Sequence, residues 1–155
     1  MAIKEKITQT THLSYYEGKI PISYRYTYGL AGELFFRKLK EGKLIASVAQ
    51  QSGVIYCPPR IFCEDSFEEI TDYVELDGAG VVESFTISCE DMHGDEQEPT
   101  LIAFVRFDGA DGGFAAPLRA EASAVYIGME VKLAFAPKAQ RKGSITDVYF
   151  VPLAR

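Results

Sequence analysis

Cysteine and histidine are the residue types of this sequence best suited to binding a metal ion. Cys89 and His93 stand four residues apart, a spacing that can supply two metal ligands. Tetrahedral zinc takes four protein ligands, or three where one position stays open, and no second pair lies nearby in the sequence. Because Cys89 follows an apolar stretch, we interpret it as a small core residue rather than as a ligand.

Sequence motifs of the common nucleophilic and nucleotide-dependent enzymes are missing. The sequence contains no GxSxG, GxxxxGK[ST], HExxH or GxGxxG pattern. A nucleophilic cysteine would need a base within reach, and His12 and His93 are the two histidines available. The carboxylates crowded into residues 64–98 are typical of a solvated acidic surface. We therefore expect a protein that is not itself a catalyst.

The segment 137–143, Pro-Lys-Ala-Gln-Arg-Lys-Gly, holds the densest cluster of positive charge. Its cations are Lys138, Arg141 and Lys142. Side chains of this kind bind the phosphates of a nucleotide-like group through charge-assisted hydrogen bonds. The alternative interpretation is an exposed turn whose charges only keep the surface soluble.

Charge is distributed unevenly along the 155 residues. Residues 64–98 contain thirteen Asp and Glu and neither Lys nor Arg, whereas basic residues outnumber acidic ones on both sides of this segment. An acidic middle repels a phosphate backbone, so nucleic acid is not an expected partner. We expect any anionic ligand to bind at one of the two basic ends.

The composition, with 47% hydrophobic and 25% charged residues, is that of a globular protein. No apolar run approaches the roughly 20 residues of a membrane-spanning helix. The first residues also lack the apolar core of a secretory signal, so we expect a cytoplasmic protein. Cys57, Cys63 and Cys89 are too few for a disulfide framework, and we expect free thiols.

Residues 20–28 alternate in type, which predicts a short strand, and Pro21 places that strand at a sheet edge. The large residues on one face are Ile20, Ile22, Tyr24, Tyr26 and Tyr28. Residues 30–40 change to a helical spacing, and Gly42 is expected to end that helix. The apolar helix face is predicted to hold Leu30, Leu34, Phe35 and Leu39. Since an edge strand invites pairing, residues 20–28 are a candidate surface for homo-oligomers or partner docking.

Residues 43–70 are predicted to form a hairpin, with strands at 43–48 and 54–56. Pro58 and Pro59 should end the second strand, because neither can donate a hydrogen bond to a ladder. A hairpin of this size is too small to bury a core alone. Its interior is expected to hold the apolar residues Val48, Val54, Ile55, Tyr56, Ile61, Phe62 and Phe67.

From Tyr73 onward the sequence predicts strands. We expect one long strand from Tyr73 through Gly78 and Gly80 to Ser88, bent at its glycines. The other expected strands are 101–107, 114–118, 129–135 and 145–151, with an acidic loop at 90–100 and a helical or irregular crossover at 120–125. Five strands, one of them serving both sides, fit a small Greek-key barrel of the OB type; a five-stranded half-sandwich is the alternative.

Three short motifs occur together in this sequence in an order that resembles one protein family. They are Pro58-Pro-Arg with Cys63 downstream, Gly78-x-Gly80-Val-Val, and Ile127-Gly-Met. Over residues 29–152 the chain resembles the zinc-ribbon and OB-fold proteins of the domain-of-unknown-function thirty-five family. The resemblance implies a mainly β fold. Its parts would be an extended segment and helix (1–42), a rubredoxin-like ribbon hairpin (43–70) and a five-stranded OB-fold barrel (71–155).

The ribbon of that family binds zinc through four positions that correspond here to Ala49, Ser52, Cys63 and Ser66, so one ligand remains. Cys57 precedes Pro-Pro-Arg and does not stand at a ligand position. Even with Cys57, two thiolates fall short of a closed zinc site. We therefore expect a metal-free ribbon and a purified protein without stoichiometric zinc.

The resemblance also implies a function. The expected protein is a non-catalytic accessory subunit that binds coenzyme A or acyl-CoA together with a thiolase-like or hydratase-like acyl-CoA enzyme, onto which it docks. Lys138, Arg141 and Lys142 are the candidates for contacts with the phosphates. Arg60 is a separate candidate at the ribbon, with local hydrogen bonding to carbonyls as the alternative. The competing hypothesis is a nucleic-acid-binding OB module, which the net charge of −6 disfavours.

Overall fold

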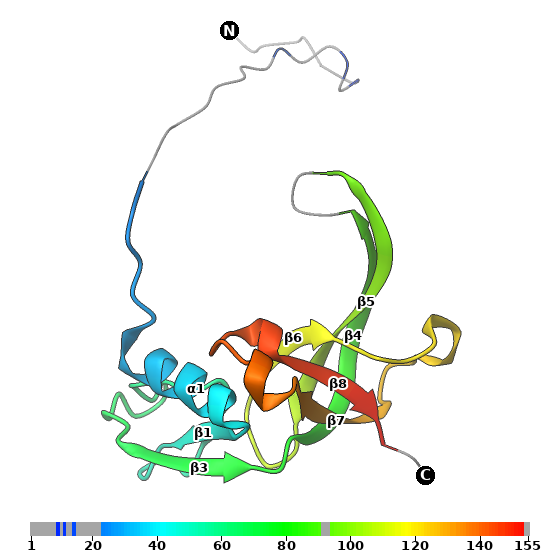
Figure 1. Ribbon diagram of the computed structural model, residues 1–155. Helices are drawn as coiled ribbons and strands as arrows, with labels where there is room; N and C mark the ends of the chain where they lie inside the picture. Colours follow the sequence, from blue (N-terminus) through cyan, green and yellow to red (C-terminus); the bar gives the residue numbers. More distant parts are fainter. Residues whose placement is uncertain (1–8, 10, 12–13, 15–22, 91–93, 154–155) are drawn as a thin grey trace, which may run out of the picture.

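The computed structural model describes residues 9, 11, 14, 23–90 and 94–153 (Figure 1). It is mainly β, with one α-helix and two antiparallel sheets. In chain order the elements are α1 (Gly29–Glu41), β1 (Leu44–Val48), β2 (Ile55–Tyr56), β3 (Asp72–Leu76), β4 (Ala79–Glu90), β5 (Glu96–Phe107), β6 (Gly113–Pro117), η2 (Ala122–Ala124), β7 (Glu130–Phe135), η3 (Lys138–Gln140), η4 (Ile145–Asp147) and β8 (Val148–Pro152).

The α1 helix lies close to its predicted range and ends as predicted at Gly42. This glycine adopts φ 88°, and its N–H donates to the Leu39 carbonyl. Ala31, Phe35 and Leu39 are buried at four-residue spacing, which places them on one helix face. The prediction that Leu30 joins this face is wrong: Leu30 is 79% exposed, because the buried face runs through Ala31, Phe35 and Leu39 and Leu30 points away from it.

The predicted N-terminal strand is not present in its described part. Residues 23–28 form neither helix nor strand, and residues 20–22 lie outside the described residues. No described strand lies alongside residues 23–28, so their backbone has no ladder to join. Tyr24, Tyr26 and Tyr28 are exposed.

The first sheet has the order β2-β1-β3, and we call it the ribbon sheet. The predicted hairpin forms β1 and β2, paired through Ser47 and Tyr56. The expected long strand from Tyr73 to Ser88 is in fact two strands, because β3 pairs with β1 from Leu44↔Leu76 onward. Gly78 separates them at φ 81°, where its carbonyl accepts a hydrogen bond from the Leu133 N–H.

The second sheet has the order β6-β5-β4-β7-β8, which confirms the expected OB-type fold. The sheet is not closed into a continuous barrel. Its two edge strands approach at a single bridge, Leu118↔Phe150, beside a hydrogen bond from the Arg119 N–H to the Phe150 carbonyl. Residues 145–147, expected to begin the last strand, form the 3₁₀ helix η4 because Ser144 and Asp147 make a capping box.

The acidic loop expected at 90–100 is largely strand. Glu96–Thr100 belongs to β5, and Glu90 pairs with Glu96. The β4–β5 hairpin therefore extends far beyond the body of the sheet, and Figure 1 shows its outer part rising from the rest of the chain as a curved arm.

One hydrophobic cluster joins α1, β1 and the OB-type sheet. Phe107, Phe114 and Phe150 form its centre with ring centroids 5.0–6.0 Å apart. Phe35 of α1 packs edge-on against Phe114 at 6.0 Å. A second, small cluster lies within the ribbon: Ala49, Tyr56, Cys63 and Ile70.

Candidate functional site

The four positions that the family resemblance assigns to zinc ligands lie around Cys63. The Cys63 sulfur lies 3.3 Å from the Ser52 hydroxyl and 3.3 Å from the Tyr56 hydroxyl. Ser66 also hydrogen-bonds this sulfur, and Ala49 packs in the same buried cluster. The ribbon thus keeps the geometry of a metal knuckle around a single thiol.

These hydroxyl donors change the acidity of the cluster. Hydrogen bonds from Ser52, Ser66 and Tyr56 lower the pKa of Cys63 to about 6, because they stabilise the thiolate. The hydrogen bond to Cys63, together with burial, raises the pKa of Tyr56 to about 12. One thiolate and two serine hydroxyls do not make a structural zinc site, and the described residues contain no group of three His, Cys, Asp or Glu placed to hold a metal.

The other two cysteines do not extend this donor set. Cys57 is buried, and burial raises the pKa of its thiol to about 12. Cys89 is exposed, so the prediction of a core residue is wrong. It lies on the projecting part of β4, beyond the cover of the other strands. Its suggested partner His93 lies outside the described residues.

The basic segment 137–143 is held in place by the buried carboxylate of Asp147. The backbone N–H groups of Lys142, Gly143 and Ser144 donate to it, at 2.9, 2.6 and 3.1 Å to Oδ2. Burial raises the pKa of Asp147, but these donors and the Arg141 charge outweigh burial and hold it below its ordinary value. Asp147 therefore fixes the backbone conformation of residues 142–144 and with it the position of Lys142.

The Arg141 side chain makes contacts within the fold. Its Nε donates to the Ala136 carbonyl at 2.6 Å, and its guanidinium lies 5.3 Å from the centre of the Phe135 ring. The guanidinium also contacts Gly42, at the C-terminal end of α1, where a positive charge is favourable. Arg141 ties the basic segment to the helix, which leaves it less available to a ligand.

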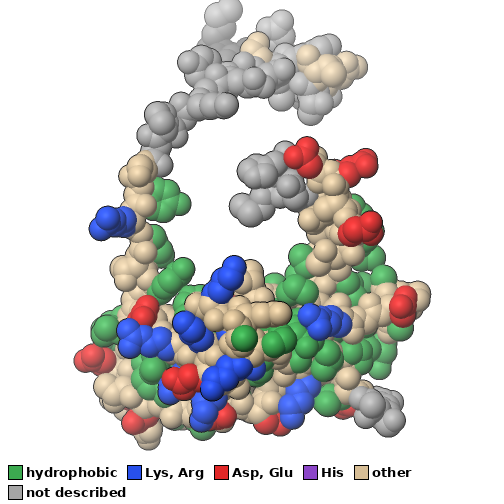
Figure 2. All heavy atoms as spheres, viewed as in Figure 1, with side chains coloured by type: hydrophobic (Ala, Val, Ile, Leu, Met, Phe, Trp, Pro, Cys, Tyr) green, Lys and Arg blue, Asp and Glu red, His purple; other side chains and the backbone are tan. Residues whose placement is uncertain are grey.

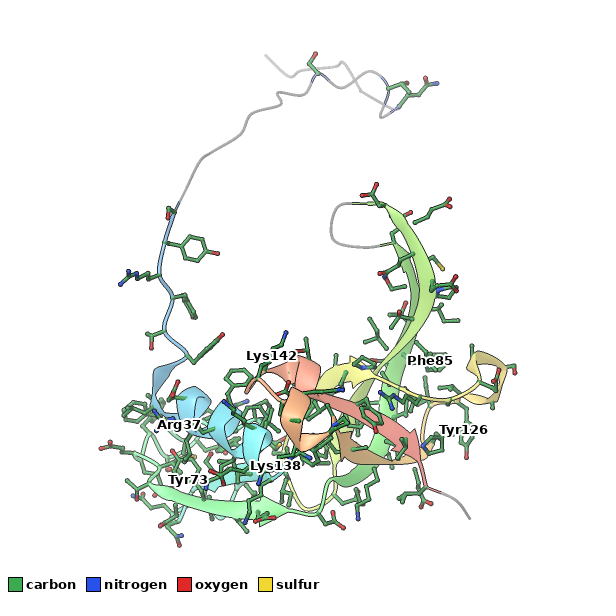
Figure 3. All side chains as sticks on the ribbon, viewed as in Figure 1. Arg37, Tyr73, Phe85, Tyr126, Lys138 and Lys142 are labelled. Atoms are coloured by element: carbon green, nitrogen blue, oxygen red, sulfur yellow. The ribbon has the colours of Figure 1, made fainter. Side chains whose placement is uncertain are left out.

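Lys142 lies across from α1 and lines a hollow of about 280 Å³ that we call the basic groove. The other lining residues are Tyr28, Glu33, Phe36, Arg37, Lys40 and Gly143. Figure 3 shows Lys142 and Lys138 on opposite sides of their segment, and Lys138 does not line the groove. Arg37 and Lys40 were missed by the sequence analysis. Their three-residue spacing on the exposed helix face was the available signal.

Arg60 lies in a different place from the other three candidates. Its guanidinium pairs with Glu64 and stacks over the Tyr56 ring at 4.5 Å, which agrees with a local structural role. It lines a cleft of about 400 Å³ between the first turn of α1 and the ribbon.

This cleft, which we call the apolar cleft, is bordered by large exposed hydrophobic side chains. Leu30 is 79% exposed, Tyr28 65% and Phe62 54%. The prediction that Ile61, Phe62 and Phe67 form the ribbon interior is wrong, since all three are exposed. Tyr28 lines both the apolar cleft and the basic groove, so the two hollows are neighbours.

Comparison with known proteins identifies the family. The profile of the ChsH2 C-terminal OB-fold domain matches residues 73–136. A solved structure of a protein of unknown function from the DUF35 family of Sulfolobus solfataricus is 32% identical, with a TM-score of 0.62, and the match covers 80% of this chain and 86% of that chain. This chain belongs to the DUF35 family. The resemblance inferred from Pro58-Pro-Arg and Ile127-Gly-Met is thereby confirmed.

A second solved structure with the DUF35 fold is the Ltp2-ChsH2(DUF35) aldolase. Its matching chain is 20% identical, with a TM-score of 0.61, and the match covers 77% of this chain and 91% of that chain. A search of curated proteins finds no match to this DUF35 chain. Its one described α-helix is too short and too polar to cross a membrane.

Proposed function

We propose that this DUF35 protein is a non-catalytic accessory subunit that docks onto a thiolase-like or hydratase-like acyl-CoA enzyme and helps it to bind coenzyme A or acyl-CoA. The observation that carries the proposal is the adjacency of the apolar cleft and the basic groove, which share Tyr28. A docked enzyme covering the cleft would bring its own ligand beside the groove.

The apolar cleft is suited to docking. Its exposed Tyr28 and Leu30 are continuous in sequence with the exposed Tyr24 and Tyr26, and the ribbon contributes the exposed Phe62. Exposed apolar clusters rimmed by polar residues mark protein interfaces, and tyrosine is enriched in them. Residues 23–28 would then order against the partner, which keeps the predicted docking role of this segment without requiring a strand in the free protein.

The basic groove is suited to the phosphates of coenzyme A. Lys40, Lys142 and Arg37, whose Nε also donates to Glu33 of the same groove at 2.7 Å, offer three cations beside the Tyr28 and Phe36 rings, whose centroids lie 4.7 Å apart. Coenzyme A carries a diphosphate and a further phosphate next to an adenine ring, so cations beside aromatic rings match both parts of it. This assignment keeps Lys142 and moves the main contacts from Lys138, Arg141 and Arg60 to the helix.

The Ltp2-ChsH2(DUF35) aldolase supports the proposal, because in that protein a DUF35 chain of the same fold is named together with Ltp2. At 20% identity this support concerns the kind of assembly and not particular residues.

Ligand binding is tested with Arg37→Ala/Lys40→Ala/Lys142→Ala. The complex of the chain with its partner enzyme, recovered from the native host, is titrated with coenzyme A at low salt. We expect the triple variant to bind about tenfold more weakly, which corresponds to about 1.4 kcal/mol. The control Lys43→Ala/Arg106→Ala/Lys132→Ala removes the same charge elsewhere and should keep the native affinity. Equal affinity of the two variants would refute a role for the groove.

Docking is tested separately with Leu30→Asp/Phe62→Asp. This variant should lose the partner enzyme in a pull-down, whereas Ile127→Asp, which alters a side chain that is 70% exposed elsewhere, should retain it. Recovery of a thiolase-like protein with the control and not with the variant supports the docking surface. Recovery with both contradicts it.

A further inference from the structure

The outer part of the β4–β5 hairpin has no neighbouring strand on either side. Pairing of β4 with β7 ends at Val81, and pairing of β5 with β6 begins at Ile102. Among the described strands, residues 87–90 and 96–101 therefore pair only with each other, and we call residues 83–90 and 94–99 the acidic arm. A two-stranded ribbon is only marginally stable in water without a further surface to pack against.

The acidic arm carries an uncovered apolar face. Phe85 and Ile87 are 40% and 46% exposed. They pair directly with Ala103 and Leu101, which are buried in the core. Since directly opposed residues share a sheet face, Phe85 and Ile87 continue the core face of the sheet onto the arm. This is the face that a docked surface would cover.

The charge of the arm specifies the kind of surface that fits it. Glu90, Glu96 and Glu98 are exposed, and none of them takes part in the ion pairs found within the described ranges. No Lys or Arg occurs between residues 64 and 98 to neutralise them. Figure 2 shows Asp and Glu side chains on the outer part of the arm, while most Lys and Arg side chains of this view lie over the body. A surface that complements these carboxylates must be cationic.

The chain itself presents such a surface in the basic groove. Arg37, Lys40 and Lys142 supply the cations, and the Tyr28 and Phe36 rings supply apolar area. We propose that the acidic arm docks onto the basic groove of a second copy of this chain. Reciprocal contacts, with each arm on the other copy's groove, close the assembly at two copies. The proposal does not require a partner enzyme or coenzyme A, although a groove filled by the arm is closed to coenzyme A, so the two occupants would compete.

The dimer is held by local charge complementarity against the repulsion of two chains of net charge −6. Salt screens charges over about 10 Å at 0.1 M, so contacts between the arm and the groove weaken as salt rises. We therefore expect dimers at low salt and monomers at high salt in sedimentation of the purified chain.

Two charge reversals test the pairing. Glu90→Lys/Glu96→Lys/Glu98→Lys makes the arm basic, and Arg37→Glu/Lys40→Glu/Lys142→Glu makes the groove acidic. Each variant alone places like charges together and should sediment as a monomer. Their equimolar mixture places opposite charges at both contacts and should restore a 1:1 dimer, which also shows that both variants are folded. The control Asp108→Lys/Glu121→Lys/Glu130→Lys should dimerise like the native chain.

A native chain that sediments as a monomer at low salt would overturn the proposal. So would dimers of either reversed variant alone, or a mixture that remains monomeric while both variants show native circular dichroism. Because these experiments contain neither enzyme nor coenzyme A, their failure leaves the proposed function standing, and the failure of that function leaves the dimer standing.

Discussion

The ribbon sheet packs around a cluster of four buried residues, whereas the described part of the OB-type sheet shares a cluster of nineteen with α1 and β1. The two clusters also differ in chemistry. The large one is apolar and rich in phenylalanine, while the small one is built around the Cys63 sulfur and its hydroxyl donors. Within one short chain, the region with a large apolar area is held by hydrophobic packing, whereas the small ribbon cluster also uses polar contacts around the Cys63 sulfur.

The comparison also indicates how the ribbon is maintained without four ligands. The buried segment formed by β1 and the residue after it belongs to both parts, since Leu44, Ile45 and Ala46 of β1 lie in the large cluster and Ala49 lies in the small one. The ribbon is thus supported by the core of its neighbour. A ribbon detached from the OB-type sheet would lose that support.

The largest expected effect comes from restoring the metal site. Ala49→Cys/Ser52→Cys/Ser66→Cys places four cysteines around one point, and we expect it to bind one zinc ion with an apparent free energy on the order of 10–16 kcal/mol. Elemental analysis after dialysis against a chelator measures the zinc content, with the native protein, for which no zinc is expected, as the control. A triple variant without zinc would show that the knuckle has lost its tetrahedral geometry.

The second prediction concerns the shared core. Phe150 is fully buried beside Phe107 and Phe114, so Phe150→Ala should cost about 3–5 kcal/mol of the free energy of unfolding. Because the segment formed by β1 and Ala49 belongs to both clusters, ribbon and OB-type sheet should unfold in one transition, measured by urea denaturation with tyrosine fluorescence and circular dichroism. Phe67→Ala, at an 82% exposed site, should change stability by less than about 0.5 kcal/mol. Two separate transitions would contradict the shared core.

The third prediction tests the small cluster through pH. The pKa of Cys63 is about 6 in the folded chain and lies near 8.5 in an unfolded one, so folding releases a proton between these values. Stability should therefore rise from pH 6 to pH 8.5, and the contribution of Cys63 should be lost as the pH falls through 6. Urea denaturation across this range measures it. Cys63→Ala should show a flatter profile, and identical profiles would exclude a thiolate.

The smallest expected effect concerns the loop that presents Lys142. Asp147→Asn removes the charge that accepts three backbone N–H groups and should cost about 1–2 kcal/mol. Because the pKa of Asp147 is depressed on folding, its contribution is present above the ordinary value of about 3.9 and is lost as the pH falls further. Urea denaturation at pH 7 and pH 3 measures both. An equal loss at the two pH values would mean that the charge is not responsible.

Local patterns were sufficient where an element depends on its own residues. The glycine at position 42 ended α1 as predicted, and the strands expected at 114–118 and 129–135 lie within one residue of the bounds of β6 and β7. Prediction failed where the structure of a segment depends on residues that are distant in the sequence. The pairing of β3 with β1, the length of the arm and the exposure of Phe62 all follow from which surfaces meet in the fold.

The sequence by itself determined the OB-type strand pattern and the concentration of acid in residues 64–98, because each is a property of residue type and short-range spacing. The loss of three zinc ligands stays a prediction that rests on the family resemblance. Only the tertiary structure decided that Ser52, Tyr56 and Ser66 surround Cys63, and that Lys142 faces Arg37 and Lys40 rather than Arg60. Arg37 and Lys142 are more than a hundred residues apart in the chain. Burial of the α1 face against the OB-type sheet, and the hold of Asp147 on its loop, bring them together, and neither effect can be read from local spacing.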